Sequence, residues 1–322
     1  MIGIASIGRA SRDRSGLACE LGGNLVVRVW LRGGLGNQLF QYSAGLYLSK
    51  VLDEGLVLRS DLLPESADSF GGVSRWPEQI STFAHLGTVH SLSHQPPFGT
   101  STRSKIVTLG RAIASGFPDQ GLFMGMIGDR NLSSALPGFR CKRLRRDLDL
   151  NGYFLDSRIP LSVSSSLRES LRAVSSPHLN LAAERLRVRD AVAIHLRLGD
   201  HSDLDGQLIA RLTSQIRKAI ELLGLPAGAR LALFSDDTPI ALEMVESLRD
   251  FEILLPNTEG MTPVEIMNLI AGCEGLIAGV GTFAWWSAFL MDEPSQVVFM
   301  DTQKLESWSQ LSMTGWRSLQ FL

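Results

Sequence analysis

Apolar residues follow two different spacings along the second half of the chain, and the two spacings alternate. Short runs of β-branched and aliphatic residues predict strands, and the longer segments between them place apolar residues at helical intervals. The predicted strands are residues 191–196, 231–234, 252–255, 275–278 and 296–300. The predicted helices are residues 207–223, 239–248, 263–271 and 283–291. Strands and helices that alternate over short loops predict a parallel, doubly wound sheet.

The chain opens with a similar strand–helix–strand pattern. Residues 25–31 predict a strand, residues 37–52 a helix and residues 56–58 the next strand. The glycine-rich turn 32–36 joins the first strand to the helix. Such a turn lets backbone amides approach a phosphate, and the helix N-terminus adds favourable partial charge. The alternative is a tight turn with a purely structural role.

The rest of the N-terminal half is less regular. Residues 60–150 scatter Pro, Gly, Ser and His without a repeat, and residues 139–149 form a charge run centred near Arg143. We interpret this run as a solvated surface segment. The alternative is contact with an anionic lipid-linked acceptor or a membrane surface. Residues 1–23 contain scattered arginines and lack the long apolar core of a secretory signal, so we expect a poorly ordered extension.

Composition narrows the possible functions. The 322 residues suffice for two domains, and 44% apolar with 20% charged residues is typical of a packed globular protein. A net charge of −2 gives no support for nucleic-acid binding. The three cysteines show neither metal-ligand spacing nor a disulfide framework, which favours the cytoplasm, and we expect Cys273 in the core. No stretch reaches the roughly 18 apolar residues that cross a bilayer.

Polar and glycine residues cluster at the ends of the predicted strands, where doubly wound sheets bind ligands. His195, Arg197 and Asp200 follow the strand at 191–196. The Arg197 guanidinium fits a phosphate or diphosphate, although an ion pair with Asp200 is the alternative. Ser235-Asp236-Asp237 can bind ribose or base edges, or cap the next helix. Gly279–Thr282 present amides that suit a phosphate.

The turn and the helix that follows it carry a specific resemblance. Residues 33–42, Gly-Gly-Leu-Gly-Asn-Gln-Leu-Phe-Gln-Tyr, closely resemble the opening of the α-1,2-fucosyltransferase family, glycosyltransferase family 11, of bacterial type. Residues 195–200 resemble the His-x-Arg-Arg-Gly-Asp signature of α-1,2- and α-1,6-fucosyltransferases, with Leu198 in place of the second Arg. Weaker matches lie at residues 151–154, 233–237 and 279–286, the last departing from the family at Gly279, Val280 and Ala284.

The resemblance implies a GT-B-like α/β fold with two Rossmann-like domains facing a central cleft. Residues 24–175 would form the acceptor-side domain and residues 185–322 the domain that binds the GDP-sugar donor. The implied reaction is inverting transfer of L-fucose from GDP-β-L-fucose to the 2-hydroxyl of a galactose-terminated surface glycan. The enzyme would be cytoplasmic, with possible peripheral contact at the inner membrane face through the charge run.

The same resemblance and the strand-end positions give the expected site residues. Arg197 would stabilise the leaving diphosphate. Asp200, Asp203 and Asp205 are candidates for the general base, and the sequence does not choose among them. The residues expected to bind the donor are Gly34, Gly36, Asn37, Gln38, His195, Arg197, Ser235, Asp236, Gly281 and Thr282. We expect Trp285 and Trp286 to anchor their helix in the core.

Other interpretations stay open at this point. The Asp-Leu-Asp triplets at 147–149 and 203–205 do not close a strand in the manner of a metal-binding Asp-x-Asp, so we expect no metal and no cofactor besides the donor substrate. A transferase for another GDP-sugar is an alternative, as is a non-catalytic protein that binds a nucleotide or glycan. A nucleotide-dependent oxidoreductase is disfavoured because Leu39 occupies the third glycine position of the dinucleotide fingerprint.

Overall fold

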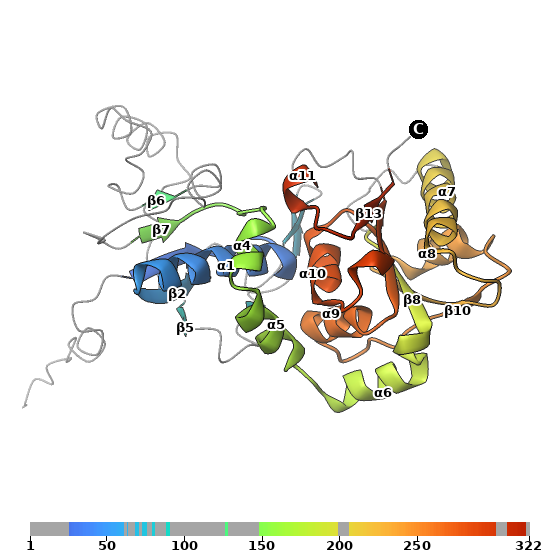
Figure 1. Ribbon diagram of the computed structural model, residues 1–322, viewed down its shortest axis with the longest axis horizontal. Helices are drawn as coiled ribbons and strands as arrows, with labels where there is room; N and C mark the ends of the chain where they lie inside the picture. Colours follow the sequence, from blue (N-terminus) through green and yellow to red (C-terminus); the bar gives the residue numbers. More distant parts are fainter. Residues whose placement is uncertain are drawn as a thin grey trace, which may run out of the picture.

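The computed structural model describes residues 26–60, 63, 68–70, 73–75, 79–80, 88–90, 126–127, 148–198, 206–300 and 308–319. These residues form two α/β units that lie side by side, each built on a parallel sheet (Figure 1). A short antiparallel pair, β3 (Asp68–Phe70) and β4 (Val73–Arg75), is separate from both sheets. Among the described helices, none combines the length and apolar character needed to cross a bilayer.

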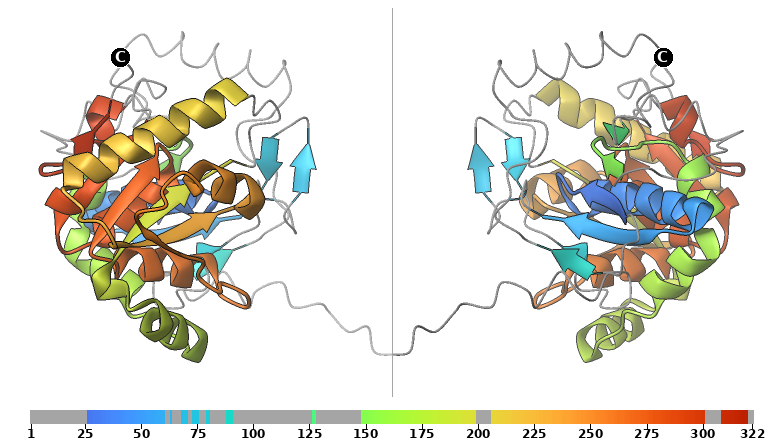
Figure 2. Two further views of the ribbon diagram at one scale, coloured as in Figure 1. Left: turned by 90° about the vertical axis from the view of Figure 1, so that its right-hand side faces the viewer. Right: turned by 90° about the vertical axis from the view of Figure 1, so that its left-hand side faces the viewer.

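The second unit is a three-layer α/β/α structure whose sheet has the order β10-β9-β8-β11-β12-β13. Its strands are β8 (Ala191–Leu196), β9 (Arg230–Ser235), β10 (Glu252–Leu254), β11 (Gly275–Gly279), β12 (Val297–Met300) and β13 (Arg317–Ser318). The helices α7 (Gly206–Leu223) and α8 (Thr238–Val245) pack on one face. The opposite face packs against α6 (Pro177–Leu186), α9 (Pro263–Ala271) and α10 (Thr282–Leu290), and the left view of Figure 2 shows both helix layers.

The alternation of side chains along β8 explains why helices cover both faces of this sheet. In β8, Val192, Ile194 and Leu196 belong to the cluster beneath α7 and α8, whereas the intervening alanines belong to the cluster on the other face. A parallel strand buried on both faces needs such a continuous apolar run. The η3 (Val188–Asp190) and η4 (Pro294–Gln296) turns lead into β8 and β12, and α11 (Trp308–Leu311) precedes β13.

The first unit has the sheet order β5-β2-β1-β7-β6, again parallel throughout. Its strands are β1 (Val26–Trp30), β2 (Gly55–Arg59), β5 (Thr88–His90), β6 (Met126–Ile127) and β7 (Leu148–Leu150). The helix α1 (Leu35–Leu52) packs against β1 and β2. The helices α4 (Arg158–Ser162) and α5 (Ser164–Arg172) follow β7, and α4 packs against α1.

The two units share part of one hydrophobic core. Trp285 and Trp286 of α10 are fully buried and belong to the same apolar cluster as Leu39 and Phe40 of α1. The Phe40 ring centroid lies 4.7 Å from that of Trp285 and 5.2 Å from that of Trp286. The expectation that both tryptophans anchor their helix is therefore confirmed, and the anchor is the core of the other unit.

The sequence predicted β1, α1 and β2 of the first unit and β8–β12 with α7–α10 of the second, with small differences at their ends. It did not predict β3–β7, α4–α6, the turns η3 and η4, α11 or β13. The interpretation of residues 139–149 as a solvated run is wrong for Asp149, which is buried in β7. Its carboxylate accepts hydrogen bonds from Arg28 Nε at 2.9 Å and Trp30 Nε1 at 3.0 Å. The negative charge of Asp149 is therefore paired with Arg28 on the neighbouring strand β1. Residues 1–23 and Arg143 lie outside the described residues.

Candidate active site

Each sheet contains a point at which the strand order reverses, and one cavity lies between the two points. In the first sheet the reversal falls between β1 and β7, and in the second it falls between β8 and β11. The loops leave neighbouring strands there in opposite directions, which opens a crevice outside the carboxyl ends. The cavity has a volume of about 670 Å³, within the range of ligand sites, and residues from both crevices line it.

Two helix N-termini meet at this cavity. Gly34 is the N-cap of α1 and Gly281 is the N-cap of α10, and no side chain caps either helix. Gly36 lies so close to α10 that a Cβ atom there would stand 2.5 Å from the backbone carbon of Thr282. Trp286 Nε1 donates to the Gly36 carbonyl at 2.9 Å, which fixes the contact. The convergence of two uncapped N-termini favours an anionic ligand.

The predicted glycine turn lines the cavity through Gly34, Gly36 and Asn37. Gly33 has a φ of 71°, a left-handed conformation that glycine adopts readily. Gln38 does not line the cavity. Its buried side chain donates to the Gly33 carbonyl at 2.8 Å and accepts from the Gln79 amide at 3.0 Å. The structure thus gives Gln38 a supporting position behind the turn, where we had expected a direct contact with the donor.

Arg197 follows β8 directly and places an exposed side chain at the cavity wall. The next residue, Leu198, is only 2% exposed and packs in the apolar cluster beneath α7 and α8. Its backbone amide donates to Asp236 Oδ1 at 2.7 Å, which ties the ends of β8 and β9 together. Asp236 therefore lines the cavity and also holds the backbone next to Arg197 in place.

His195 lines the cavity beneath this loop. Its ring stacks on Phe283 with a centroid distance of 5.4 Å. The pKa of His195 is lowered to about 4, chiefly by burial; the Asp236 carboxylate opposes this shift and the Arg197 guanidinium adds to it. The imidazole is therefore neutral at neutral pH. It can offer one hydrogen bond to a ligand without adding charge.

The remaining predicted residues divide into three groups. Ser235 and Thr282 line the cavity, and the Ser235 hydroxyl accepts from the Asp237 amide at 3.0 Å. Asp237 caps α8 by accepting from Ile240, as the alternative interpretation of this motif required. Gly281 does not itself line the cavity but begins α10 at its edge. Asp200 and Asp205 lie outside the described residues, so their assignment as candidate bases stays a prediction.

Several lining residues were missed in the sequence. Tyr153, 42% exposed, follows β7 and lines the cavity from the first unit, together with Gln79. Leu255, Pro256 and Ile266 add an apolar wall from the loop after β10 and from α9. The weak family match at 151–154 was a signal for Tyr153. The apolar wall carries no sequence signal, because isolated aliphatic residues in a loop are common.

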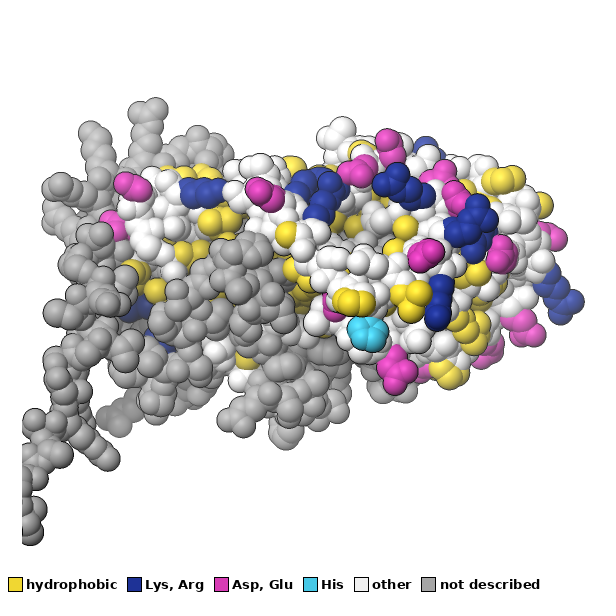
Figure 3. All heavy atoms as spheres, turned by 90° about the horizontal axis from the view of Figure 1, so that it is seen from below, with side chains coloured by type: hydrophobic (Ala, Val, Ile, Leu, Met, Phe, Trp, Pro, Cys, Tyr) yellow, Lys and Arg dark blue, Asp and Glu magenta, His cyan; other side chains and the backbone are white. Residues whose placement is uncertain are grey.

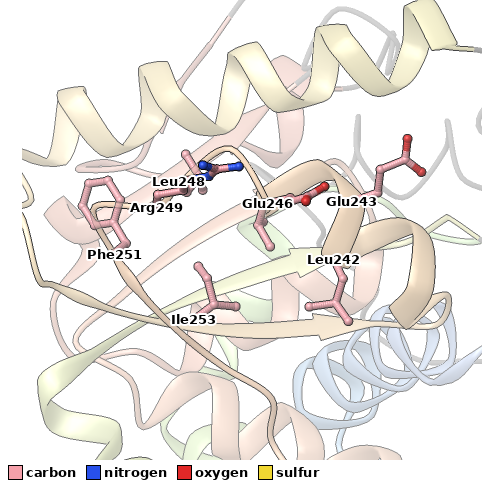
Figure 4. A pocket seen from close by; sticks show the side chains of 8 residues that line it. Leu242, Glu243, Glu246, Leu248, Arg249, Phe251 and Ile253 are labelled. Atoms are coloured by element: carbon pink, nitrogen blue, oxygen red, sulfur yellow. The ribbon is translucent and has the colours of Figure 1, made fainter.

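A smaller cavity of about 340 Å³ lies elsewhere on the second unit. The segment from α8 to β10 supplies its lining, which includes Leu242, Glu243, Glu246 and Arg249 (Figure 4). It lacks the convergence of strand ends that marks the larger cavity. Over the described residues, no three His, Cys, Asp or Glu side chains gather closely enough to hold a metal ion. On the described part of the face in Figure 3, acidic and basic side chains are interspersed.

The model of glycosyl transferase family 11 matches residues 145–316, more than half of the chain. The chain belongs to glycosyl transferase family 11. It is therefore a glycosyltransferase, and its two parallel α/β units have the GT-B-like arrangement that the sequence predicted. Comparison with curated protein sequences gave no match to this family 11 chain.

Three solved structures are similar to this chain at low sequence identity. NodZ α-1,6-fucosyltransferase soaked with GDP-fucose is 14% identical, covers 88% of this chain and 97% of its own, and gives a TM-score of 0.49. An Arabidopsis thaliana FUT1 variant in complex with GDP is 11% identical, with coverages of 84% and 71% and a TM-score of 0.46. POFUT1 in complex with GDP-fucose is 14% identical, with coverages of 86% and 97% and a TM-score of 0.43.

Proposed function

We propose that this glycosyltransferase transfers L-fucose from GDP-β-L-fucose to the 2-hydroxyl of a galactose-terminated glycan, with inversion to an α-1,2 linkage. One observation carries the proposal beyond family membership. The cavity between the units combines two uncapped helix N-termini with Arg197, as recognition of a diphosphate leaving group requires.

The chemistry follows from where negative charge develops. As the glycosidic bond breaks, charge accumulates on the departing GDP diphosphate. Arg197 and residues at the starts of α1 and α10 line the cavity, and in this proposal they bind that charge together with the Thr282 hydroxyl. Neutral His195 can add one hydrogen bond. In this proposal the reaction needs no metal ion, because fixed protein groups stabilise the leaving diphosphate.

The nucleoside and the acceptor are assigned to different groups of lining residues. Asp236 and Ser235, with the apolar wall of Leu255 and Pro256, are proposed to hold the nucleoside. The first unit is proposed to hold the acceptor, and Tyr153 offers it an aromatic ring and a hydroxyl. The base that accepts the proton of the attacking hydroxyl is proposed to be Asp200 or Asp205.

The test begins with donor binding and ends with product analysis. GDP should raise the melting temperature of the protein, whereas UDP and NAD should not; equal stabilisation by all three would refute the donor assignment. Transfer from GDP-[¹⁴C]fucose and GDP-[¹⁴C]mannose to a panel of galactosides then separates fucosyl transfer from transfer of another GDP-sugar. Activity should survive EDTA, and NMR of the product should show an α-1,2 linkage.

A further inference from the structure

The described lining of the cavity is short of positive charge for a nucleoside diphosphate. Among its described lining residues, Arg197 is the cation, Asp236 is an anion and His195 is neutral. A diphosphate brings more than one negative charge into a partly dry space, where uncompensated charge is costly. The resemblance places a second arginine at position 198, but this chain has a leucine there, packed in an apolar cluster.

A cation with buried, unused hydrogen-bonding capacity lies at the start of the glycine turn. Arg32 directly precedes Gly33 and Gly34, which line the cavity. Its Nε is buried without a hydrogen-bond partner, and no ion pair joins Arg32 to any other described residue. An unpaired buried donor is destabilising, so its retention calls for an explanation.

A second orphaned donor belongs to the same contact. Gln41 Oε1 accepts a hydrogen bond from the Arg32 backbone amide at 2.8 Å, and the buried Gln41 Nε2 has no partner. Gln41 is 0% exposed, so its amide is fixed by packing in α1. Two buried donors without acceptors thus occur at the end of β1, the reversal point of the first sheet. Both donors lack an acceptor oxygen.

We propose that Arg32 is a second binding residue for the donor diphosphate, contributed by the first unit and positioned by Gln41. The proposal rests on the proposed function and adds to it a specific ligand contact. Arg32 would supply the positive charge that an arginine at position 198 would have supplied, from the residue that directly precedes the glycine turn lining the cavity. The diphosphate is then bound by Arg197 of one unit and Arg32 of the other, and donor binding links the two units.

The test measures GDP affinity by isothermal titration calorimetry in wild type, Arg32→Gln and Arg32→Lys. Arg189→Gln is the matched control, because Arg189 is an exposed arginine at the opposite end of β8. Arg32→Gln should bind GDP about 10- to 100-fold more weakly, the range expected for a charge-assisted hydrogen bond. Arg32→Lys should recover part of the loss, and Arg189→Gln should bind as wild type does.

A second measurement uses the unaltered protein. Phenylglyoxal modification, read by peptide mass spectrometry, should be slowed by GDP at Arg32 and Arg197 and unaffected at Arg189. If Arg32→Gln is folded and binds GDP as wild type does, or if GDP leaves Arg32 modification unchanged, the inference is wrong. If the wild-type protein binds no GDP, the proposed function fails instead, so the two failures are distinguishable.

Discussion

The contact between Gly36 and α10 gives a sharp test of how the site is assembled. In Gly36→Ala the new methyl carbon would lie 2.5 Å from the Thr282 backbone carbon and 2.6 Å from the Phe283 backbone nitrogen. Both are backbone atoms, so no side-chain rotation can relieve the overlap. The substitution must separate the first turns of α1 and α10, or strain them.

Two costs and one gain set the expected change in the free energy of unfolding. Overpacking of this kind costs about 1–3 kcal/mol, and displacement of the Trp286 hydrogen bond to the Gly36 carbonyl costs about 1 kcal/mol more. Replacing a helical glycine with alanine returns about 0.5–1 kcal/mol. The free energy of unfolding should therefore fall by about 2 kcal/mol. GDP affinity should fall as well, because both N-termini are displaced from the ligand.

Two matched glycine variants separate stability from binding. Gly45→Ala lies further along α1 and would meet the side chains of Val29 and Leu56, so it should lose stability but keep GDP affinity. Gly272→Ala ends α9 with ordinary contacts and a helical backbone, and should change neither property. Urea unfolding and calorimetric titration with GDP measure the two quantities. Gly36→Ala that matches Gly272→Ala in both would refute the close approach of α1 and α10.

Substitutions at three residues test the end of β8 and the loop that follows it. Arg197→Ala should lower kcat/KM for donor transfer about a hundredfold, since two charge-assisted hydrogen bonds are lost, and Arg197→Lys should rescue poorly because it lacks the planar fork; near-normal activity in folded Arg197→Ala would contradict the diphosphate assignment. In Leu198→Arg the free energy of unfolding in urea should fall by several kcal/mol, because the guanidinium would enter an apolar cluster without a partner. Wild-type stability would show that the side chain at position 198 can leave this cluster. The pKa of His195 in the folded protein is lowered to about 4, so as the pH falls this residue is protonated in the unfolded chain before it is protonated in the folded protein. Keeping His195 neutral in the folded protein therefore favours folding only while the unfolded chain is neutral there too. That contribution to stability is complete above pH 6.5 and is lost toward pH 4, so His195→Phe should be less acid-sensitive than wild type by up to about 2 kcal/mol between pH 7 and 5; equal acid sensitivity would show that the imidazole is solvated.

Hydrophobic spacing predicted the second unit well because its strands are buried on both faces. Ala191–Leu196 is an unbroken apolar run up to His195, and Pro263–Ala271 begins with a proline and a threonine cap that mark its start. In the first unit β7 was missed for the opposite reason. Asp149 sits inside a three-residue strand and interrupts its apolar pattern, since its charge is paired with Arg28 on β1, 121 residues away. Sequence spacing carries no information about such a partner.

In the candidate site, too, some residues could be predicted from the sequence and others depend on packing. Arg197, Asp236 and Thr282 were predicted from their places at strand ends, and all three line the cavity. Gln38 was misplaced because a motif shows which residues recur, and not whether each one contacts the ligand or supports the turn. The burial of Leu198 likewise depends on the packing of α7 and α8. The sequence showed an arginine missing at this position, and only packing shows that none could be accommodated there without cost.

The shared core explains why the site cannot belong to one unit alone. Trp285 and Trp286 place the start of α10 against α1, and the hydrogen bond from the Trp286 indole N–H to the Gly36 carbonyl fixes the contact at the cavity edge. The N-terminus of α10 is therefore positioned by the first unit, although its residues lie in the second. A ligand that binds both N-termini gains from a spacing that the buried tryptophans already fix, and little ordering remains to oppose binding. Preorganisation of this kind suits a site that must stabilise charge at the moment a bond breaks, because dipoles already in place need no rearrangement.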